Sequence, residues 1–282
     1  MKIALVYNPR LAAKRAAKVQ ALAAVLEARG HDVVHHAGDS FDAALDAPGA
    51  DCIVAAGGDG TARLVIGSQR EPGSLPPVAV YPIGTINLLA RELEYPRDPE
   101  RFAARIENVA AHTVSRLAML DEEPFLACAS IGFDAQTVAV VNEELKLKIG
   151  RFAYVAAMAS LARNWPRRKL VLDCDGERIE AEALFVLRGR FYAGPWTLDR
   201  GAALDGAKLR ALALPQARRR DIARLLTYAL TGSHIPHDRW HFLEADRIAV
   251  DCDADVPVQA DGDVVGKGPS LFSLSPDSVN FL

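Results

Sequence analysis

The sequence predicts two domains, an α/β domain with a parallel sheet followed by a mostly antiparallel β domain. Strand and helix patterns alternate up to about residue 110, which is typical of a parallel sheet with helices on both faces. Strand-like stretches separated by Asp-Gly pairs dominate after that point, as in antiparallel sheets. The predicted domains are residues 1–118 and 119–282, with about the last ten residues expected to pack back on the first domain.

The elements of the first half follow from short apolar runs and their turn residues. Residues 3–7 are an apolar strand that ends at Asn8-Pro9, and the Ala-rich stretch 11–29 has helical spacing and ends at Gly30. Three more strands and one helix complete this half: strands 32–36, 51–56 and 77–81, and a helix over 61–69. Ligands of parallel sheets bind beyond the carboxyl ends of the strands, so the turns that follow these strands are expected to line one edge.

The second half is predicted mainly as strands with two helical insertions. The strand-like stretches are 123–131, 168–174, 178–189, 205–214, 239–251 and 256–260. The helical insertions are predicted over 134–164 and 216–231.

Composition excludes several classes of protein. The net charge of −3 gives no argument for nucleic acid, and none is expected as a partner. The four cysteines form no C-x-x-C pair, so we interpret them as small buried side chains in a reducing compartment. No run of about 18 apolar residues exists, and Met1-Lys2 leads directly into a strand pattern rather than a signal peptide. These observations predict a cytoplasmic protein.

The most informative stretch is the turn after strand 51–56. Residues 55–61 read Ala-Ala-Gly-Gly-Asp-Gly-Thr. Gly57, Gly58 and Gly60 lack the Cβ atoms that block a close approach, and they permit positive φ. Successive N–H groups in such a turn, followed by a helix start near Thr61, form an anion site. The turn therefore predicts phosphate binding, although no Gly-Lys-Ser/Thr follows as in a P-loop.

A second turn follows strand 77–81 and reads Pro82-Ile-Gly-Thr-Ile-Asn-Leu-Leu-Ala-Arg91. Thr85 offers a hydroxyl to a phosphate, and Asn87 can either cap the following helix or reach a ligand. Taken alone this segment is a weak signal, since helix capping explains it equally well.

The two turns together resemble the catalytic domain of the diacylglycerol kinase and sphingosine kinase family, in particular the soluble bacterial lipid kinases. The resemblance runs over essentially the whole chain and is strongest in residues 1–95. Asn8-Pro9, the segment Ser130–Ala135 and Asp261-Gly262-Asp263 also match family motifs. The family implies a Rossmann-like α/β domain of the NAD kinase type, a C-terminal β-sandwich, and an active site that uses ATP and Mg²⁺.

The resemblance also implies roles for individual residues. The nucleotide would contact two turns and the end of the first strand: Asn8, Gly57, Gly58, Asp59, Gly60, Thr61, Gly84, Thr85 and Asn87. Asp59 would act through Mg²⁺, Asp205 lies in a loop that binds a structural Mg²⁺ in the family, and Asp134 would contact substrate. Asp261 or Asp263 would accept the proton of the lipid hydroxyl; Asp263 replaces a glutamate of the family, and the choice between the two is open.

Residues 146–169 form a basic segment with interspersed apolar residues and no acidic side chain. Such a segment could lie on an anionic membrane surface, which would make the protein peripheral at the inner membrane face. The alternative is a helix whose apolar face packs on the β domain and whose charged side chains face the solvent. Exposed strand edges of a β domain often pair, so a homodimer is a further possibility.

The leading hypothesis is thus a kinase that transfers the γ-phosphate of ATP to a hydroxyl of diacylglycerol or a related lipid. One alternative is an NAD kinase, which also resembles this chain in the Gly-Gly-Asp-Gly-Thr string. Another is a catalytically weak module that binds nucleotide or lipid. The segment from Pro82 to Asn87 favours the lipid kinases over the NAD kinases.

Overall fold

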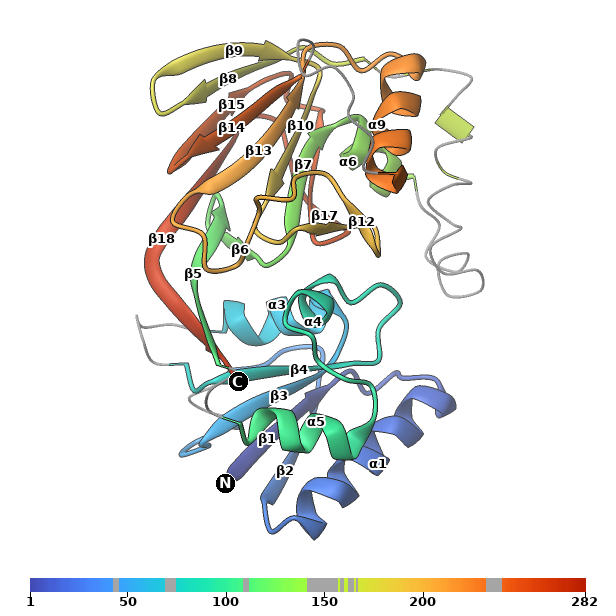
Figure 1. Ribbon diagram of the computed structural model, residues 1–282, viewed down its shortest axis with the longest axis vertical. Coiled ribbons are helices and arrows are strands. Elements are labelled where there is room, and N and C mark those ends of the chain that lie inside the picture. The colour runs from blue at the N-terminus through green and yellow to red at the C-terminus, as the bar shows by residue number, and fades with distance from the viewer. Residues whose placement is uncertain are drawn as a thin grey trace. The chain divides into compact units, whose positions relative to one another are not determined.

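The computed structural model describes residues 1–42, 46–68, 75–108, 112–140, 157, 160–161, 165, 167–231 and 240–282. The chain divides into two compact units (Figure 1). Unit 1 consists of Met1–Leu117 together with Ser275–Leu282, and unit 2 consists of Ala118–Leu274.

Unit 1 contains a parallel sheet of the predicted kind. Its strands are β1 (Lys2–Tyr7), β2 (Asp32–Ala37), β3 (Cys52–Gly57) and β4 (Val78–Pro82), in the order β2-β1-β3-β4. Every residue of β3 and β4 is buried, because helices cover both faces of the sheet (Figure 1). The predicted α/β class is therefore confirmed for this unit.

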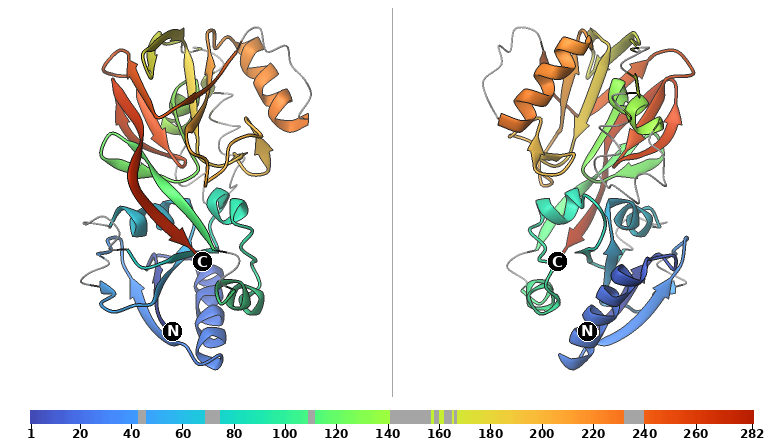
Figure 2. Two further views of the ribbon diagram at one scale, coloured as in Figure 1. Left: turned by 60° about the vertical axis from the view of Figure 1, so that its left-hand side comes forward. Right: turned by 90° about the vertical axis from the view of Figure 1, so that its right-hand side faces the viewer.

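Four described helices surround this sheet. They are α1 (Ala13–Ala28), α3 (Asp59–Gly67), α4 (Leu88–Glu92) and α5 (Pro99–Ile106). Helices α1 and α5 pack together on one face, and α3 contacts α4 on the other (Figures 1 and 2). Helix α5 was not predicted from the sequence, although Asp98 caps it by accepting from Arg101 N at 3.0 Å and Pro99 is its first residue.

Unit 2 contains two antiparallel sheets. The first has the order β14 (His241–Ala245), β13 (Leu209–Leu214), β10 (Ala183–Leu187), β7 (Cys128–Gly132), β16 (Pro257–Ala260) and β17 (Asp263–Lys267). The second includes the first residues of β18 (Ser270–Phe281), then β15 (Arg247–Asp251), β8 (Leu170–Cys174) and β9 (Glu177–Ala181). Strand β5 (Thr113–Leu120) pairs with β18 and with β6 (Glu123–Phe125), and a short ribbon joins β11 (Phe191–Tyr192) to β12 (Trp196–Thr197).

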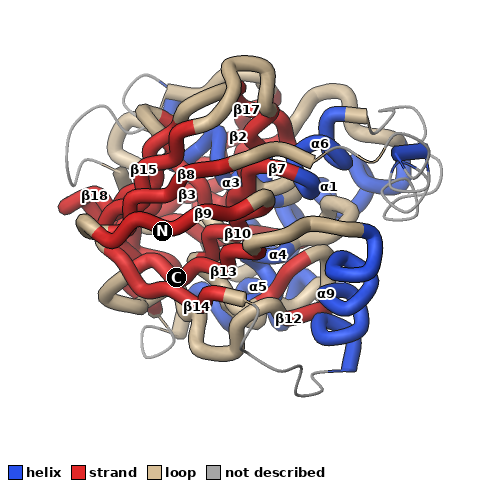
Figure 3. Tube along the Cα trace, turned by 90° about the horizontal axis from the view of Figure 1, so that it is seen from above, coloured by secondary structure: helices blue, strands red, loops and turns tan. Residues whose placement is uncertain are grey.

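The two sheets of unit 2 share one apolar core, which confirms the predicted β-sandwich. Ile131 and Val186 come from the first sheet and Ile248 and Phe272 from the second, and all belong to one buried cluster. Helix α6 (Phe133–Ala139) contacts β7 and β16, and α9 (Arg219–Thr231) lies beside β12 (Figure 3).

Strand β18 was not predicted, and it belongs to both units. Its first residues pair with β15 in unit 2, and Phe281 pairs with Val78 of β4 in unit 1. Buried and less buried side chains alternate along most of its twelve residues, but Ser, Pro and Asp at 275–277 obscure the strand pattern in the sequence.

Several predicted elements differ in their bounds. The strand predicted over 178–189 is two strands, β9 and β10, and that predicted over 239–251 is β14 and β15. Helix α6 ends at Ala139, and residues 141–156 of the predicted insertion lie outside the described residues. Within the described part of the chain, no helix is long and apolar enough to cross a membrane.

Candidate active site

The Gly-Gly-Asp-Gly-Thr turn joins β3 directly to α3. Helix α3 begins at Asp59, two residues earlier than predicted, with Gly58 at its N-cap in an extended conformation (φ −107°, ψ −167°). Positive φ, one of the two reasons expected for Gly57, Gly58 and Gly60, occurs at none of the three. Space is the reason instead, because a Cβ on Gly57 would lie 2.1 Å from Thr61 Oγ1.

The turn after β4 packs directly against the turn after β3. Ile83 N and Gly84 N both donate to Gly57 O, at 3.1 and 3.0 Å. A Cβ on Gly84 would lie 2.5 Å from Gly58 Cα, so the backbones could not approach this closely with larger residues. The glycines thus allow the two turns to pack together at the carboxyl edge of the sheet, which is where the sequence predicted that the turns would meet.

Asp59 joins the second turn through its side chain. It is only 8% exposed, and its Oδ2 and Oδ1 accept hydrogen bonds from Leu88 N and Leu89 N, both at 2.9 Å. These are the first N–H groups of α4, so Asp59 caps a helix that starts 29 residues further along the chain. The carboxylate is therefore a structural link between the two turns.

Asn87 occupies the N-cap position of α4 but does not cap it with its side chain. Its backbone is left-handed (φ 55°), and its Nδ2 donates to Gly84 O at 2.9 Å. Its Oδ1 is buried and has no hydrogen-bond partner within the described residues. A buried acceptor beside Gly58 and Gly84 is costly unless a donor or a cation satisfies it, which suits a ligand site.

Two exposed residues lie at the interlocked turns, Asn8 after β1 and Thr85 within the second turn. Asn8 Oδ1 accepts from Arg10 N at 2.7 Å, and Asn8 Nδ2 donates to Asp39 Oδ1 at 3.3 Å. Thr85 Oγ1 accepts from Arg15 Nη2 at 3.3 Å. Arg15 lies on α1 and was not identified from the sequence, since nothing in its helical spacing shows that it reaches a turn 70 residues away.

The late Asp-Gly-Asp motif is the hairpin that joins β16 to β17. Asp261 (φ 51°) and Gly262 (φ 89°) form the two-residue turn, as Asp-Gly pairs commonly do. The Asp261 carboxylate holds the loop between β6 and β7 in place. It accepts from Leu126 N and Ala127 N at 2.8 Å and from Cys128 N at 3.2 Å. Asp263 is the first residue of β17 and is half-buried.

The same construction occurs a second time in unit 2, at Asp175-Gly176-Glu177. Asp175 (φ 50°) and Gly176 (φ 95°) join β8 to β9. Asp175 also braces a loop, because its carboxylate accepts from Asp246 N and Arg247 N at 3.0 Å. The recurrence indicates that Asp261 and Asp175, the first residues of the two turns, have a structural function. The hairpins differ in the residue after the turn, which is Asp263 in one and Glu177 in the other.

Asp134 lies in a polar network beside the hairpin that joins β16 to β17. Its carboxylate accepts from Ser130 Oγ at 2.6 Å, from Gln259 Nε2 at 3.2 Å and from the Tyr192 hydroxyl. Gln259 Oε1 in turn accepts from Gly262 N at 2.9 Å. Burial raises the pKa of Asp134, while the three donors act in the opposite direction. The network connects the predicted substrate residue to the turn that precedes Asp263.

The predicted metal ligands remain predictions. Asp59 is engaged by α4 as described, and Asp205 is exposed in the loop before β13. Among the described residues, no group of three or more His, Cys, Asp or Glu side chains could hold a metal ion.

Most of the basic segment 146–169 lies outside the described residues. At its end, Arg168 pairs with Asp255 at 2.7 Å and Lys169 with Glu180 at 2.9 Å. Trp165 stacks on Phe133 with ring centroids 4.5 Å apart and donates to Ala217 O at 2.6 Å. These contacts anchor the end of the segment to unit 2, and contact with a membrane stays a prediction.

Comparisons with known proteins agree with this architecture. Residues 2–119 match the diacylglycerol kinase catalytic domain, and residues 127–282 match the YegS C-terminal NAD kinase β-sandwich-like domain. The diacylglycerol kinase of Staphylococcus saprophyticus is 27% identical over 226 residues, which are 79% of this chain and 73% of that protein. That of Staphylococcus aureus is 27% identical over 256 residues, which are 88% and 81% of the two chains.

A solved structure shows the same fold. The crystal structure of a diacylglycerol kinase from Bacillus anthracis superimposes with a TM-score of 0.77 at 19% identity, covering 99% of this chain and 96% of that one. An α/β unit with interlocked glycine turns and an NAD kinase-like β-sandwich define a phosphotransferase of the kinase class. The chain belongs to the diacylglycerol kinase family that combines these two domains.

Proposed function

We propose that this kinase transfers the γ-phosphate of ATP to a hydroxyl of diacylglycerol or a closely related lipid, with Mg²⁺ as cofactor. The observation that carries the proposal is the match of residues 2–119 to the diacylglycerol kinase catalytic domain, since the interlocked turns lie within it. ATP supplies the transferable phosphoryl group, and Mg²⁺ neutralises the charge of its phosphates.

The first unit binds and orients the phosphates. The N–H groups at the start of α3 and the hydroxyls of Thr61 and Thr85 are hydrogen-bond donors of the kind that phosphate oxygens need. Arg15, whose guanidinium is already within hydrogen-bonding distance of Thr85, contributes a positive charge at the same turn. Asn8 is exposed beside them and completes the proposed nucleotide contacts.

The proposed cation contacts involve Asp59 and Asn87. Each carboxylate oxygen of Asp59 accepts an N–H from α4, which fixes the carboxylate in the turn between Gly58 and Gly60. Asn87 Oδ1 is a buried acceptor next to the same turns. Carboxylate and amide oxygens are suitable ligands for Mg²⁺ or for its bound water.

In the second unit we assign the general base to Asp263 and a positioning role to Asp261. The hydroxyl oxygen of the lipid attacks the γ-phosphorus, its proton passes to the Asp263 carboxylate, and the bond to the ADP oxygen breaks. Asp261 is engaged by three backbone N–H groups, which supports its role in holding the hairpin rather than accepting a proton.

The experiment that tests the proposal measures transfer of label from [γ-³²P]ATP to diacylglycerol, sphingosine and NAD in parallel assays. We expect labelled phosphatidic acid from diacylglycerol in mixed micelles. Label only in NADP would instead identify an NAD kinase, and nucleotide binding without transfer to any acceptor would identify a binding module. Asp263→Asn should abolish transfer, whereas Glu177→Gln, at the corresponding position of the second hairpin, should retain it.

We also propose peripheral contact with the bilayer that contains the substrate. The basic residues of 146–169 supply the positive charge that such contact needs, apart from those near its end that pair with acidic side chains. Sedimentation with vesicles containing anionic lipid should show binding that weakens as salt is raised. Equal binding to neutral and anionic vesicles would contradict this proposal.

A further inference from the structure

A buried arginine faces the loop in which a structural metal ion was expected. Arg188 directly follows β10, is 2% exposed, and is among the largest fully buried side chains of the described chain. Its Nη1 donates to Gly206 O at 3.1 Å and to Lys208 O at 3.4 Å, and its Nη2 donates to Leu204 O. One guanidinium thus donates hydrogen bonds to the carbonyls of three alternating residues.

Convergent backbone carbonyls are the surroundings that a hard cation prefers. Ca²⁺ and Mg²⁺ bind to oxygen ligands, among them main-chain carbonyls. In this loop the carbonyls on both sides of Asp205 are directed at the Arg188 guanidinium, while Asp205 itself is exposed. A guanidinium is charged at every pH at which proteins are folded, so this cation is permanent.

The residues present do not fit a metal ion in the same place. A divalent cation that used these carbonyls would displace the guanidinium's hydrogen bonds and lie close to its positive charge. Gly206 is also held tightly, since a Cβ there would be 3.0 Å from Ala203 O and 3.8 Å from Arg188 Nη1.

We propose that the Arg188 guanidinium is the structural cation of the loop 204–208 and replaces a metal ion there, so that unit 2 folds independently of divalent cations. The position of Arg188 matters for the proposed active site, because its backbone is linked to Asp261. Arg188 N donates to Ala127 O at 2.9 Å, and Ala127 N donates to Asp261 Oδ1 at 2.8 Å. The residue that carries this charge is therefore hydrogen-bonded through its backbone to the same segment that Asp261 holds.

Thermal unfolding without nucleotide or lipid tests the proposal independently of the proposed kinase activity. The unmodified protein should melt at the same temperature in excess EDTA as after dialysis, and it should retain no stoichiometric metal ion by mass spectrometry. Arg188→Ala should melt at a lower temperature, and Mg²⁺ or Ca²⁺ should raise that temperature in a saturable manner, because the vacated carbonyls then bind the metal.

Arg190→Ala is the matched control, since Arg190 is exposed and its guanidinium lies over the Phe191 ring, 5.0 Å from the centroid. It should respond to cations as the unmodified protein does. A metal ion that the unmodified protein retains and Asp205→Asn loses would overturn the proposal. So would an Arg188→Ala protein whose melting temperature matches the control or ignores added cation. If Arg188→Ala does not fold, Arg188→Lys keeps a positive charge and should fold with the same insensitivity to EDTA.

Discussion

Within the two turns, the glycines, Asn87 and Asp59 each make a different contribution to the structure. The glycines were expected to give both close approach and positive φ, and they give close approach alone, as the 2.5 Å separation between Gly58 Cα and a Cβ on Gly84 demonstrates. Asn87 was a candidate helix cap, but Asp59 performs the capping from the neighbouring turn. Asp59 therefore contributes to the fold in addition to its proposed contact with Mg²⁺.

Replacing Asp59 should consequently reduce both stability and turnover. Asp59→Ala removes the acceptor of two buried N–H groups, and we expect it to lower the free energy of unfolding by about 2 kcal/mol. Asp98→Ala is the matched control, because Asp98 caps α5 in a similar way. It should cost about 1 kcal/mol and leave turnover unchanged. Full turnover in folded Asp59→Ala protein would contradict the proposed role of this carboxylate.

Arg15 should matter for nucleotide affinity and little for folding. Arg15→Ala removes a half-buried positive charge beside Thr85, and we expect the KM for ATP to rise about tenfold through loss of a charge-assisted contact. Lys14→Ala changes the exposed neighbour and should leave the KM unchanged. Equal KM values for the two variants would show that Arg15 only orients Thr85.

For single residues, the sequence predicted which turns form the candidate site but not which contacts their side chains make. Residues 57–61 and 82–87 were identified because glycines after buried strands form a local pattern. The contacts Arg15–Thr85 and Asp134–Gln259 join residues 70 and 125 positions apart, and a local pattern carries no information about them. Family resemblance could not separate Asp261 from Asp263, whereas the hydrogen bonds of Asp261 favour Asp263 as base.

Among the elements, those predicted correctly have strong apolar periodicity. Strands β1, β3 and β4 are buried runs with clear ends, and the predicted bounds agree within one residue. Helix α5 and strands β5, β17 and β18 were missed because they are short, charged or rich in polar residues. Tertiary packing decides the conformation of such segments.

Helices α1 and α5 are also joined at their ends by a charge cluster whose effect depends on pH. Glu107 accepts from Arg29 Nε at 3.0 Å, and its Oε1 lies 2.9 Å from His31 Nε2. The hydrogen bond from Arg29, helped by His31, lowers the pKa of Glu107 to about 2. The stabilisation is therefore complete above the ordinary carboxyl pKa of 4.5 and disappears as the pH falls towards 2.

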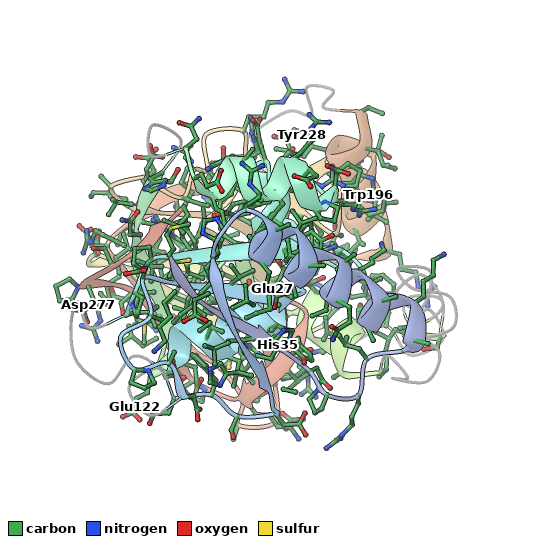
Figure 4. All side chains as sticks on the ribbon, turned by 90° about the horizontal axis from the view of Figure 1, so that it is seen from below. Glu27, His35, Glu122, Trp196, Tyr228 and Asp277 are labelled. Carbon is green, nitrogen blue, oxygen red and sulfur yellow. The ribbon has the colours of Figure 1, made fainter. Side chains whose placement is uncertain are left out.

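Glu107→Gln should thus destabilise the protein at neutral pH and cease to do so in acid. The measurement is urea unfolding of both proteins at several pH values between 7 and about 2. Glu27→Gln is the control, because Glu27 is exposed on α1 (Figure 4) and should give a small difference that does not vary with pH. A Glu107→Gln effect that stays constant down to pH 2 would exclude the Arg29 contact as its cause.

For the whole molecule, the notable feature is that unit 1 is not continuous in sequence. Ser275–Leu282 belong to it although the chain passes through all of unit 2 first. Tyr95 donates to Leu282 O, and Leu282 N donates to Val78 O at 3.0 Å, so these last residues are hydrogen-bonded to β4 and its surroundings. The stability of unit 1 is therefore expected to depend on residues far from its turns in the sequence.

Two substitutions in β18 should distinguish the units. Phe281 is 2% exposed and pairs with Val78 in unit 1, whereas Phe272 is fully buried in unit 2 against the Phe125 ring. Each change to alanine should cost about 3 to 5 kcal/mol, because both remove a large buried ring. Hydrogen exchange followed by mass spectrometry should show faster exchange in β3 and β4 for Phe281→Ala, but in β6 and β15 for Phe272→Ala. Faster exchange in all four strands for either variant would mean that the two units unfold as one, because loss of packing in one unit would then destabilise both.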